Sequence, residues 1–372
     1  MIYILMLIFV IFISTIMHKN KDNKKLVIFL SLVLLVSLSA VAGVRSMELG
    51  YDAKQYIPTV FKRLEKYKKF GEFSNGFDFE FVFKAISYIA YKIHPSTMSL
   101  MFFYSFVTTL FILLFAYNEK DNLPFNCTIV IYYATLYLYS FNIMRQAIAL
   151  AIIFYSFSLL RKNKYFKSIL FLILALLSHN SAFIAVPIFI IKFVTERLDN
   201  KAKKAYFLTF TTAIVIALCF VYEDIIYLLN NIGLLPDKFV NYLSTYGDNG
   251  IDLNLADTLF KLLCVIFAFF MLRMQKLEQD ESYCFLIYAI LALMMNIIAF
   301  KIYPIYRCGN YYFYLCLFYL FPKIKTLFCE EQQKFGNGLM YTIIIAFFFW
   351  KVILGNAYLI YPYSSDIFKF LH

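Results

Sequence analysis

The sequence predicts an all-α fold, a polytopic helix bundle in a membrane, from its composition and its pattern of apolar runs. Of the 372 residues, 62% are hydrophobic and only 16% are charged, and the mean hydropathy is +0.71. Soluble domains are roughly 45–50% apolar and about 25% charged. Apolar runs of about 20 residues recur along the whole chain, and each is long enough to cross a hydrocarbon core as a helix. We therefore expect about 11–13 transmembrane helices and no soluble domain.

The expected spans follow the apolar runs in chain order. They lie near 2–17, 26–44, 98–117, 125–141, 143–160, 168–178, 181–194, 205–222, 258–274, 282–300, 308–321 and 338–354. Two of them, 168–178 and 181–194, are short and are expected to form one broken hairpin around Ser178-His179-Asn180. No Gly/Ser-rich linker or internal repeat interrupts the pattern, so residues 1–372 are expected to form a single membrane domain.

Short basic loops predict the orientation, because cytoplasmic loops carry an excess of Lys and Arg. The basic clusters follow the first, fifth, seventh and eleventh spans, at 19–25, 161–167, 192–204 and 323–334. The N-terminus and the loops 45–97 and 223–257 are then outside. Residues 45–80 are also basic, which argues for the opposite side. The segment 79–93 decides the parity, and its length favours an interfacial or re-entrant helix over a span.

Charge and cysteine usage exclude several classes of protein. The net charge is +12, but most basic residues lie beside apolar runs and none interleave with aromatic residues on a soluble fold, so no nucleic acid is expected. None of the seven Cys residues forms a CxxC pair or a zinc-like spacing with His. Neither a phosphate-binding glycine loop nor an acidic metal motif is visible, so no cofactor and no metal are expected.

Polar side chains at the ends of the apolar runs are the candidate site residues, because a buried charge in a membrane is costly and usually faces a cavity or a partner. Arg45 begins the first group, in which Asp52 and Tyr56 would share a helix face. Arg145 and Gln146 join two apolar runs with almost no loop. An interfacial anchor at Arg45, a helix cap at Asp52 and an exposed turn at Arg145 are the structural alternatives.

Three further positions complete the set. His179 interrupts a long apolar stretch, either as a hydrogen-bonded core residue or as a proton carrier. Arg307 and Tyr311 begin a late span, either as part of a site or as an aromatic belt with a basic anchor. Glu80 lies at the entrance of the 79–93 segment, where a carboxylate would also suit the helix dipole. Several cations with few acids suit a pyrophosphate, and a carboxylate or imidazole suits a sugar hydroxyl.

At these residues the sequence resembles the EpsG-like family of exopolysaccharide proteins, related to Wzy-type polysaccharide polymerases. The matching pieces are Arg45…Gly50-Tyr51-Asp52…Tyr56, Asn142-Ile143-Met144-Arg145-Gln146-Ala147-Ile148-Ala149, Leu174-Ala175…His179-Asn180-Ser181-Ala182, Arg307 with Tyr311, and Tyr361-Pro362-Tyr363. The usual Gly-Thr-Asp turn reads Gly50-Tyr51-Asp52 here, and the usual His-Ser/Thr pair reads His179-Asn180-Ser181.

The resemblance implies a metal-independent polymerase at the outer face of the bacterial cytoplasmic membrane, acting in capsule, exopolysaccharide or O-antigen synthesis. It would move a growing glycan from undecaprenyl diphosphate onto another lipid-linked repeat unit. Membrane lipid, a flippase and a chain-length regulator are the expected partners. The expected catalytic residues are His179, Asp52 and Arg145, and the expected substrate-binding residues are Arg45, Arg307, Gln146, Tyr311, Tyr56 and Glu80.

Three other functions fit parts of the pattern. A flippase or transporter would carry charges near the middle of the membrane and often an internal repeat. A sugar O-acyltransferase would need an acyl donor and an early His base, and His18 lies instead in a Lys-rich loop. A purely structural role in assembly would tolerate substitution at every candidate position.

Overall fold

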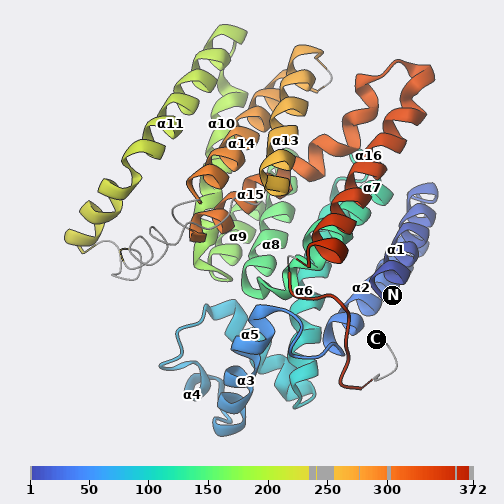
Figure 1. Ribbon diagram of the computed structural model, residues 1–372, viewed down its shortest axis with the longest axis vertical. Helices are drawn as coiled ribbons and strands as arrows, with labels where there is room; N and C mark the ends of the chain where they lie inside the picture. The colour runs from blue at the N-terminus through green and yellow to red at the C-terminus, as the bar shows by residue number, and fades with distance from the viewer. Residues whose placement is uncertain are drawn as a thin grey trace. The chain divides into compact units, whose positions relative to one another are not determined.

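The all-α prediction is confirmed by the computed structural model (Figure 1). The structure describes residues 2–233, 240, 255–275, 277–299, 303–356 and 358–367, and within this part the protein is 81% helical with no strand. The chain divides into two compact units. The first combines Met1–Phe183 with Gly338–His372, and the second is Ile184–Asn337.

Long apolar helices form the body of the first unit. They are α1 (Ile2–Lys19), α2 (Lys24–Gly43), α6 (Thr97–Asn118) and α8 (Met144–Arg161), followed by the shorter α9 (Tyr165–Leu176). Side chains of Asn23 and Ser96 cap α2 and α6, because each accepts a hydrogen bond from the backbone N–H three residues later. From Gly338 onward α16 (Gln333–Phe348) also belongs to this unit, and the π-helix η6 (Phe349–Leu354) follows it.

α6 and α8 are the centre of this unit, with α2 against α6 and α9 against α8. Two reciprocal hydrogen bonds join α8 to α9, from Ser156 Oγ to Ser168 O at 2.6 Å and from Ser168 Oγ to Ser156 O at 2.9 Å. At the opposite end from the loop that precedes α8, the buried carboxylate of Glu119 forms an ion pair with Arg161. These contacts fix α8, whose first residues belong to the candidate site.

The predicted span at 125–141 is not one regular helix. It consists of α7 (Phe125–Ile131), the π-helix η1 (Tyr132–Tyr137) and the 3₁₀-helix η2 (Tyr139–Phe141), and all of these residues are buried except Asn126. Tyrosine hydroxyls hold the π-helix to its neighbours, since Tyr133 donates to Tyr3 O and Tyr137 donates to Leu38 O, both at 2.7 Å. π-helices of this kind often adjoin functional sites.

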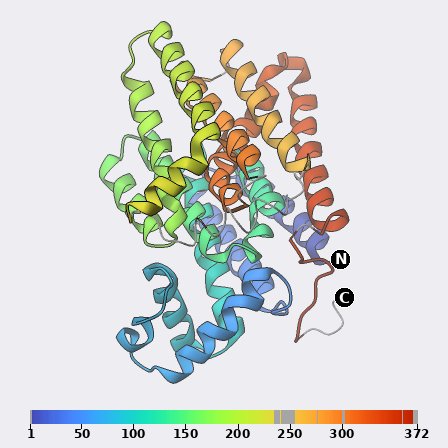
Figure 2. The same ribbon diagram turned by 60° about the vertical axis from the view of Figure 1, so that its left-hand side comes forward.

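The expected outer segment 45–97 contains three short helices. They are α3 (Tyr51–Lys66), α4 (Phe70–Ser74) and α5 (Phe81–Ile93). In Figures 1 and 2 they gather at one end of the α2, α6 and α8 helices of the same unit. With 13 residues, α5 is about 20 Å long, too short to cross a bilayer.

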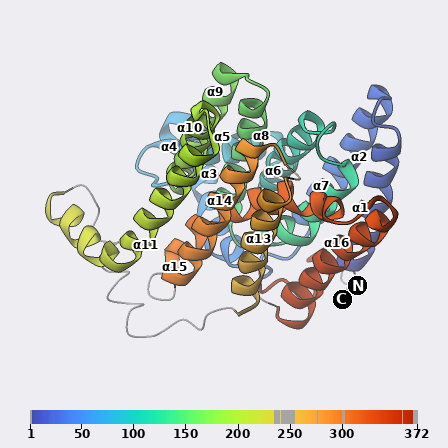
Figure 3. The same cartoon turned by 90° about the horizontal axis from the view of Figure 1, so that it is seen from above.

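The second unit contains α10 (Val186–Arg197), α11 (Lys201–Asn231), α13 (Leu255–Arg273), α14 (Gln279–Ile298) and α15 (Tyr303–Leu320), and ends in short 3₁₀ turns, η4 (Phe321–Leu327) and η5 (Glu330–Gln332). Seen from above in Figure 3, α14 runs beside α13 and α15. α11 continues to Asn231, so the first residues of the expected 223–257 loop are helical. Residues 234–239 and 241–254 of that loop lie outside the described residues.

The helix lengths agree with a multi-pass membrane protein. Six helices in the described part of the chain are long and apolar enough to cross a membrane, or up to seven if the bent α11 counts as one span. The expected hairpin at 168–194 is broken as predicted, because α9 ends at Leu176, the 3₁₀-helix η3 covers Asn180–Ala185, and α10 follows. The remaining expected spans fall on α7, α9, α10, α13 and α15.

Candidate active site

The N-terminus of α8 is held by residues that lie far away in the sequence. Asp52, which is buried in the first turn of α3, accepts a hydrogen bond from Met144 N at 2.9 Å through Oδ2. Asn142 accepts from Tyr51 N and donates to Tyr358 O, each at 2.5 Å. The start of α8, the start of α3 and the C-terminal segment are therefore tied together at one point.

Gly50 makes this junction sterically possible. Its φ of +91° lies in the region that L side chains rarely adopt, and a Cβ atom there would lie 2.7 Å from Phe141 O. The backbone of the turn before α3 therefore packs directly on the end of the η2 helix, which brings Asp52 to the N-terminus of α8.

Arg145, in the first turn of α8, lies between a carboxylate and two aromatic rings. Its Nη1 donates to Glu80 Oε2 at 2.9 Å. Its guanidinium carbon lies 4.8 Å from the centre of the Tyr56 ring and 4.6 Å from that of Phe79. The side chain is 17% exposed, and its Nε has no hydrogen-bond partner among the described residues. The rings and the carboxylate hold the guanidinium in one orientation.

His179 contacts the other oxygen of the same carboxylate. His179 Nδ1 lies 3.2 Å from Glu80 Oε1, and Asn180 N donates to that oxygen at 3.4 Å. A backbone hydrogen bond of 3.0 Å from Val82 N to Leu177 O joins the start of α5 to the end of α9. Glu80, Arg145 and His179, from three separate elements of the first unit, thus form one cluster, which we call the Glu80 cluster.

The Glu80 carboxylate is ionised at neutral pH. Burial by itself raises the pKa of Glu80, but the hydrogen bond from His179 and the positive charge of Arg145 outweigh it and lower the pKa to about 2. The Ser181 N–H also points at His179 Nδ1, at 3.3 Å, and donates to that nitrogen in the tautomer that carries no proton there. We assign the Nδ1 proton to the contact with Glu80, because a carboxylate is the stronger acceptor. In the neutral ring, Nε2 then carries the lone pair that can accept a proton.

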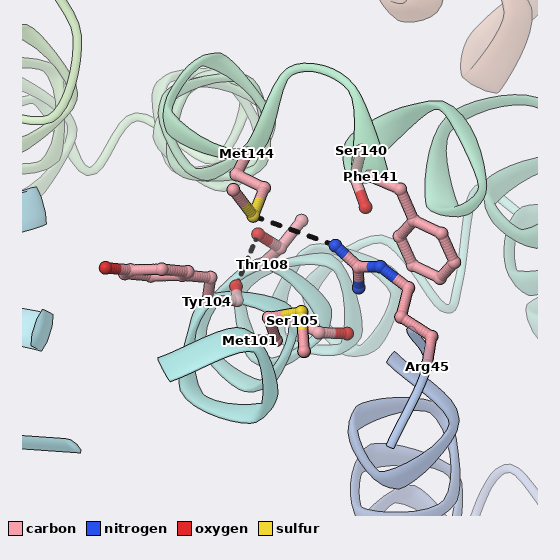
Figure 4. A pocket seen from close by; sticks show the side chains of 8 residues that line it. All are labelled: Arg45, Met101, Tyr104, Ser105, Thr108, Ser140, Phe141 and Met144. Carbon is pink, nitrogen blue, oxygen red and sulfur yellow. Dashed lines mark hydrogen bonds between the residues drawn. The ribbon is translucent and has the colours of Figure 1, made fainter. Parts of the chain in front are cut away.

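Arg45 is buried to 2% exposure and is satisfied by the protein itself. Its Nη1 donates to Ala42 O at 2.8 Å, its Nε donates to Leu49 O at 3.3 Å, and the guanidinium lies 3.9 Å from the centre of the Phe141 ring. Burial lowers the pKa of Arg45 to about 10, so the group remains a cation at neutral pH. Figure 4 shows the guanidinium beside Phe141 and Met144, at a cavity of about 10 Å³ that has room for about one water molecule.

The other predicted site residues lie in different surroundings. Gln146 is buried in the first turn of α8. Arg307 and Tyr311 belong to α15 in the second unit, where Arg307 is half-buried and Tyr311 is fully buried. The Glu80 cluster therefore brings together Glu80, Arg145 and His179 with Tyr56, while the participation of Arg307 and Tyr311 stays a prediction.

The surroundings of two largely buried cations were missed by the sequence analysis. Phe79 covers Arg145, and its position next to Glu80 was the available signal. In the second unit Lys261 is fully buried, donates to Asn296 Oδ1 at 2.6 Å and lies 4.3 Å from the Tyr306 ring centre. A Lys inside the expected span 258–274 was itself a signal of a buried polar contact. Among the described residues, no group of three or more His, Cys, Asp or Glu side chains is placed to hold a metal ion.

Among the comparisons with known proteins, one family model matches this chain. No curated protein and no solved structure matches the chain. The model of the EpsG family matches residues 28–365, nearly the whole chain, and members of this family are polysaccharide polymerase-like membrane proteins. The match covers both units and every residue of the Glu80 cluster. The chain belongs to the EpsG family and is a membrane protein of polysaccharide biosynthesis.

Proposed function

We propose that this protein is a glycosyltransferase that polymerises glycans at the outer face of the bacterial cytoplasmic membrane. It joins repeat units carried on undecaprenyl diphosphate, without a metal ion. The observation that carries the proposal is the Glu80 cluster, in which one carboxylate lies 3.2 Å from His179 Nδ1 and 2.9 Å from Arg145 Nη1. Membership of the EpsG family also supports a role in glycan polymerisation.

His179 is the general base of the proposed reaction. The imidazole donates a hydrogen bond from Nδ1–H to Glu80 and presents the unprotonated Nε2 to the sugar hydroxyl of the acceptor unit. Nε2 takes the proton of this hydroxyl as the hydroxyl oxygen attacks the anomeric carbon of the donor. The bond from that carbon to the diphosphate oxygen breaks, and the electron pair leaves with undecaprenyl diphosphate. Glu80 orients the imidazole and stabilises the imidazolium that forms, as a carboxylate does in a Ser-His-Asp triad.

Arg145 stabilises the leaving diphosphate. Nη1 is used by Glu80, but a guanidinium has five N–H donors in a planar fork that matches phosphate oxygens. Glu80 and the Tyr56 and Phe79 rings fix the fork before the substrate arrives, which lowers the cost of orienting it. Arg307 is retained as a second candidate for the diphosphate.

Asp52 and Arg45 receive positioning roles in this proposal. Asp52 is 3% exposed and accepts a hydrogen bond from Met144 N. It therefore holds the first turn of α8, which contains Arg145, and does not take the proton of the acceptor sugar hydroxyl. Arg45 uses its donors on Ala42 and Leu49 and stacks on Phe141, so it stabilises the same junction from the α2 side. Both residues therefore act through Arg145.

The test is the length of the glycan formed by single variants in cells. We expect His179→Ala to lower the polymerisation rate by roughly 10²–10⁴-fold, the usual contribution of a general base. Lipid-linked single units should then collect at the outer face. Arg145→Ala should also shorten the polymer. Lys62→Ala, a change at an exposed position on α3, is the matched control and should leave chain length unchanged.

The location of the accumulated units separates polymerisation from transport. Loss of a flippase leaves single units at the inner face, whereas loss of a polymerase leaves them at the outer face. Wild-type chain length in both His179→Ala and Arg145→Ala, with normal amounts of protein in the membrane, would refute the proposed roles. Loss of acetyl groups with normal chain length would instead indicate an acyltransferase.

A further inference from the structure

The outward face of α5 is an apolar stripe that the described part of the first unit leaves largely exposed, although Phe81 makes a ring contact with Phe70 of α4 at 5.9 Å. Phe81, Ile89 and Ile93 are 55%, 54% and 63% exposed, and Ala85 lies between them at the same helical spacing of four residues. A stripe of this kind over three turns of helix is unusual on a surface that faces water.

The opposite face of α5 is packed on a membrane-spanning helix. The Phe83 ring stacks on Tyr104 at 4.5 Å, Ser87 Oγ and Tyr104 Oη are 2.6 Å apart, and Ser99 Oγ donates to Ala90 O at 2.8 Å. Because the residue numbers run in opposite directions in these contacts, α5 lies antiparallel beside the first two turns of α6. Figure 2 shows these helices at the same end of the first unit.

The length of α6 sets the depth of α5. α6 has 22 residues and is therefore about 33 Å long, close to the thickness of the hydrocarbon core. Its first two turns must then lie at the boundary of the bilayer, and α5 lies at the same level. The stripe on α5 faces away from α6. Because α5 runs antiparallel beside α6, the stripe extends from the headgroup level near Ile93 toward the acyl chains near Phe81.

We propose that α5 docks on the bilayer through Phe81, Ala85, Ile89 and Ile93, which enter the leaflet next to the 45–97 segment. Exposed Lys92 adjoins the stripe near its C-terminal end, 5.3 Å from the Tyr88 ring centre, where an ammonium group meets anionic headgroups. An amphipathic helix with an apolar face and Lys at the polar edge is suited to this interfacial position.

Docking has a consequence for the Glu80 cluster. Glu80 is the residue immediately before α5, and its carboxylate orients His179 and Arg145. A lipid-docked α5 therefore fixes the depth of the cluster at the outer boundary of the bilayer, within reach of the diphosphate of a polyprenol carrier. This last step depends on the proposed function, whereas the docking itself does not.

The experiment is a spin-label accessibility measurement on the full chain in nanodiscs of phosphatidylcholine with phosphatidylglycerol. Nitroxide labels are attached to Ile89→Cys and Ile93→Cys in a protein whose native cysteines have been replaced. Collision rates with oxygen, which concentrates in lipid, are compared with those of a water-soluble nickel chelate. Glu65→Cys, at an exposed polar position on α3, is the matched control.

We expect the labels at 89 and 93 to collide preferentially with oxygen, and the label at 65 with the nickel chelate. Nickel-dominated collisions at 89 and 93 would overturn the proposal, because the stripe would then face water. Low collision rates with both reagents would also overturn it, because a second protein surface would then cover the stripe. The measurement does not depend on enzymatic activity, so it separates failure of docking from failure of the proposed reaction.

Discussion

Glu80 is the residue that connects the two candidate catalytic groups, because its two oxygens contact Arg145 and His179 separately. Its negative charge is needed for both contacts. Gln at this position preserves the shape of the side chain but removes the charge, and its amide competes with His179 as a donor. Catalysis and acid stability should therefore both report on this one carboxylate.

The acid stability of the protein should depend on Glu80. Because the pKa of Glu80 is lowered from 4.5 to about 2, its contribution to stability is complete above pH 4.5 and is lost as the pH falls toward 2. We expect the unfolding temperature of the wild type to fall more steeply over this window than that of Glu80→Gln. Thermal unfolding in detergent at a series of pH values measures the difference. Parallel curves for the two proteins would contradict the ionised cluster.

Gly50 should tolerate no side chain. Gly50→Ala combines a positive φ, which costs about 1–3 kcal/mol for a residue other than Gly, with a Cβ 2.7 Å from Phe141 O. We expect a lower unfolding temperature and a shorter glycan, since the junction that holds α8 is displaced. Gly71→Ala is the control, because nothing lies within 4 Å of a Cβ there. Equal stability of the two variants would show that the junction is not constrained in this way.

At the scale of single residues, the sequence identified the polar positions but not their partners. Arg145, His179 and Glu80 were selected because charges and imidazoles are costly beside apolar runs. Their convergence depends on contacts between residues as far apart as 80 and 179, which no local pattern encodes. Asp52 was assigned an acid–base role or, alternatively, a cap on its own helix. In the structure its Oδ2 accepts from Met144 N of α8, a long-range contact that neither interpretation described, and the acid–base role stays a prediction.

At the scale of secondary structure, regular apolar helices were predicted well and irregular ones were not. α2, α6 and α8 lie within a few residues of the expected spans because their apolar runs have clear ends. The span at 125–141 was expected to be regular, but its π and 3₁₀ turns depend on tyrosine hydroxyls that reach carbonyls of α1 and α2. Such hydrogen bonds are tertiary and leave no periodic signal.

The ion pair between Glu119 and Arg161 should stabilise the contact between α6 and α8. Glu119 is fully buried and Arg161 is 9% exposed, so removing one partner leaves a buried charge and should cost about 3–5 kcal/mol. We expect Glu119→Gln and Arg161→Met each to destabilise the protein, and the double variant to cost less than the sum of the two. Thermal unfolding of the four proteins in a double-mutant cycle measures the coupling.

The exposed pair of Lys54 and Glu48 is the control for this cycle. Its side chains are 67% and 69% exposed, so Lys54→Met should cost at most about 1 kcal/mol. If the Arg161→Met and Lys54→Met variants unfolded at the same temperature, the pair at Arg161 would have no structural role beyond that of a surface charge.

At the scale of the whole molecule, four basic loops predict one orientation under the positive-inside rule, against the basic residues of 45–80. Residues 45–97 are expected outside and the basic loop after α8 inside. A cysteine at exposed Lys62 on α3 should react with a membrane-impermeant maleimide in intact cells, and one at exposed Lys162 should react only after the cells are opened. The reverse pattern would place the Glu80 cluster in the cytoplasm and would remove the outer-face polymerase from consideration.

The most direct test of the central claim is polymerisation by the purified protein in nanodiscs, supplied with lipid-linked repeat units. The account predicts a ladder of lengthening glycans and release of undecaprenyl diphosphate with the wild type and with Lys62→Ala. His179→Ala and Glu80→Gln, each supplied in the same amount of folded protein as the wild type, should leave mainly single units. A ladder of wild-type length and rate from His179→Ala would contradict the assignment of the imidazole as the base.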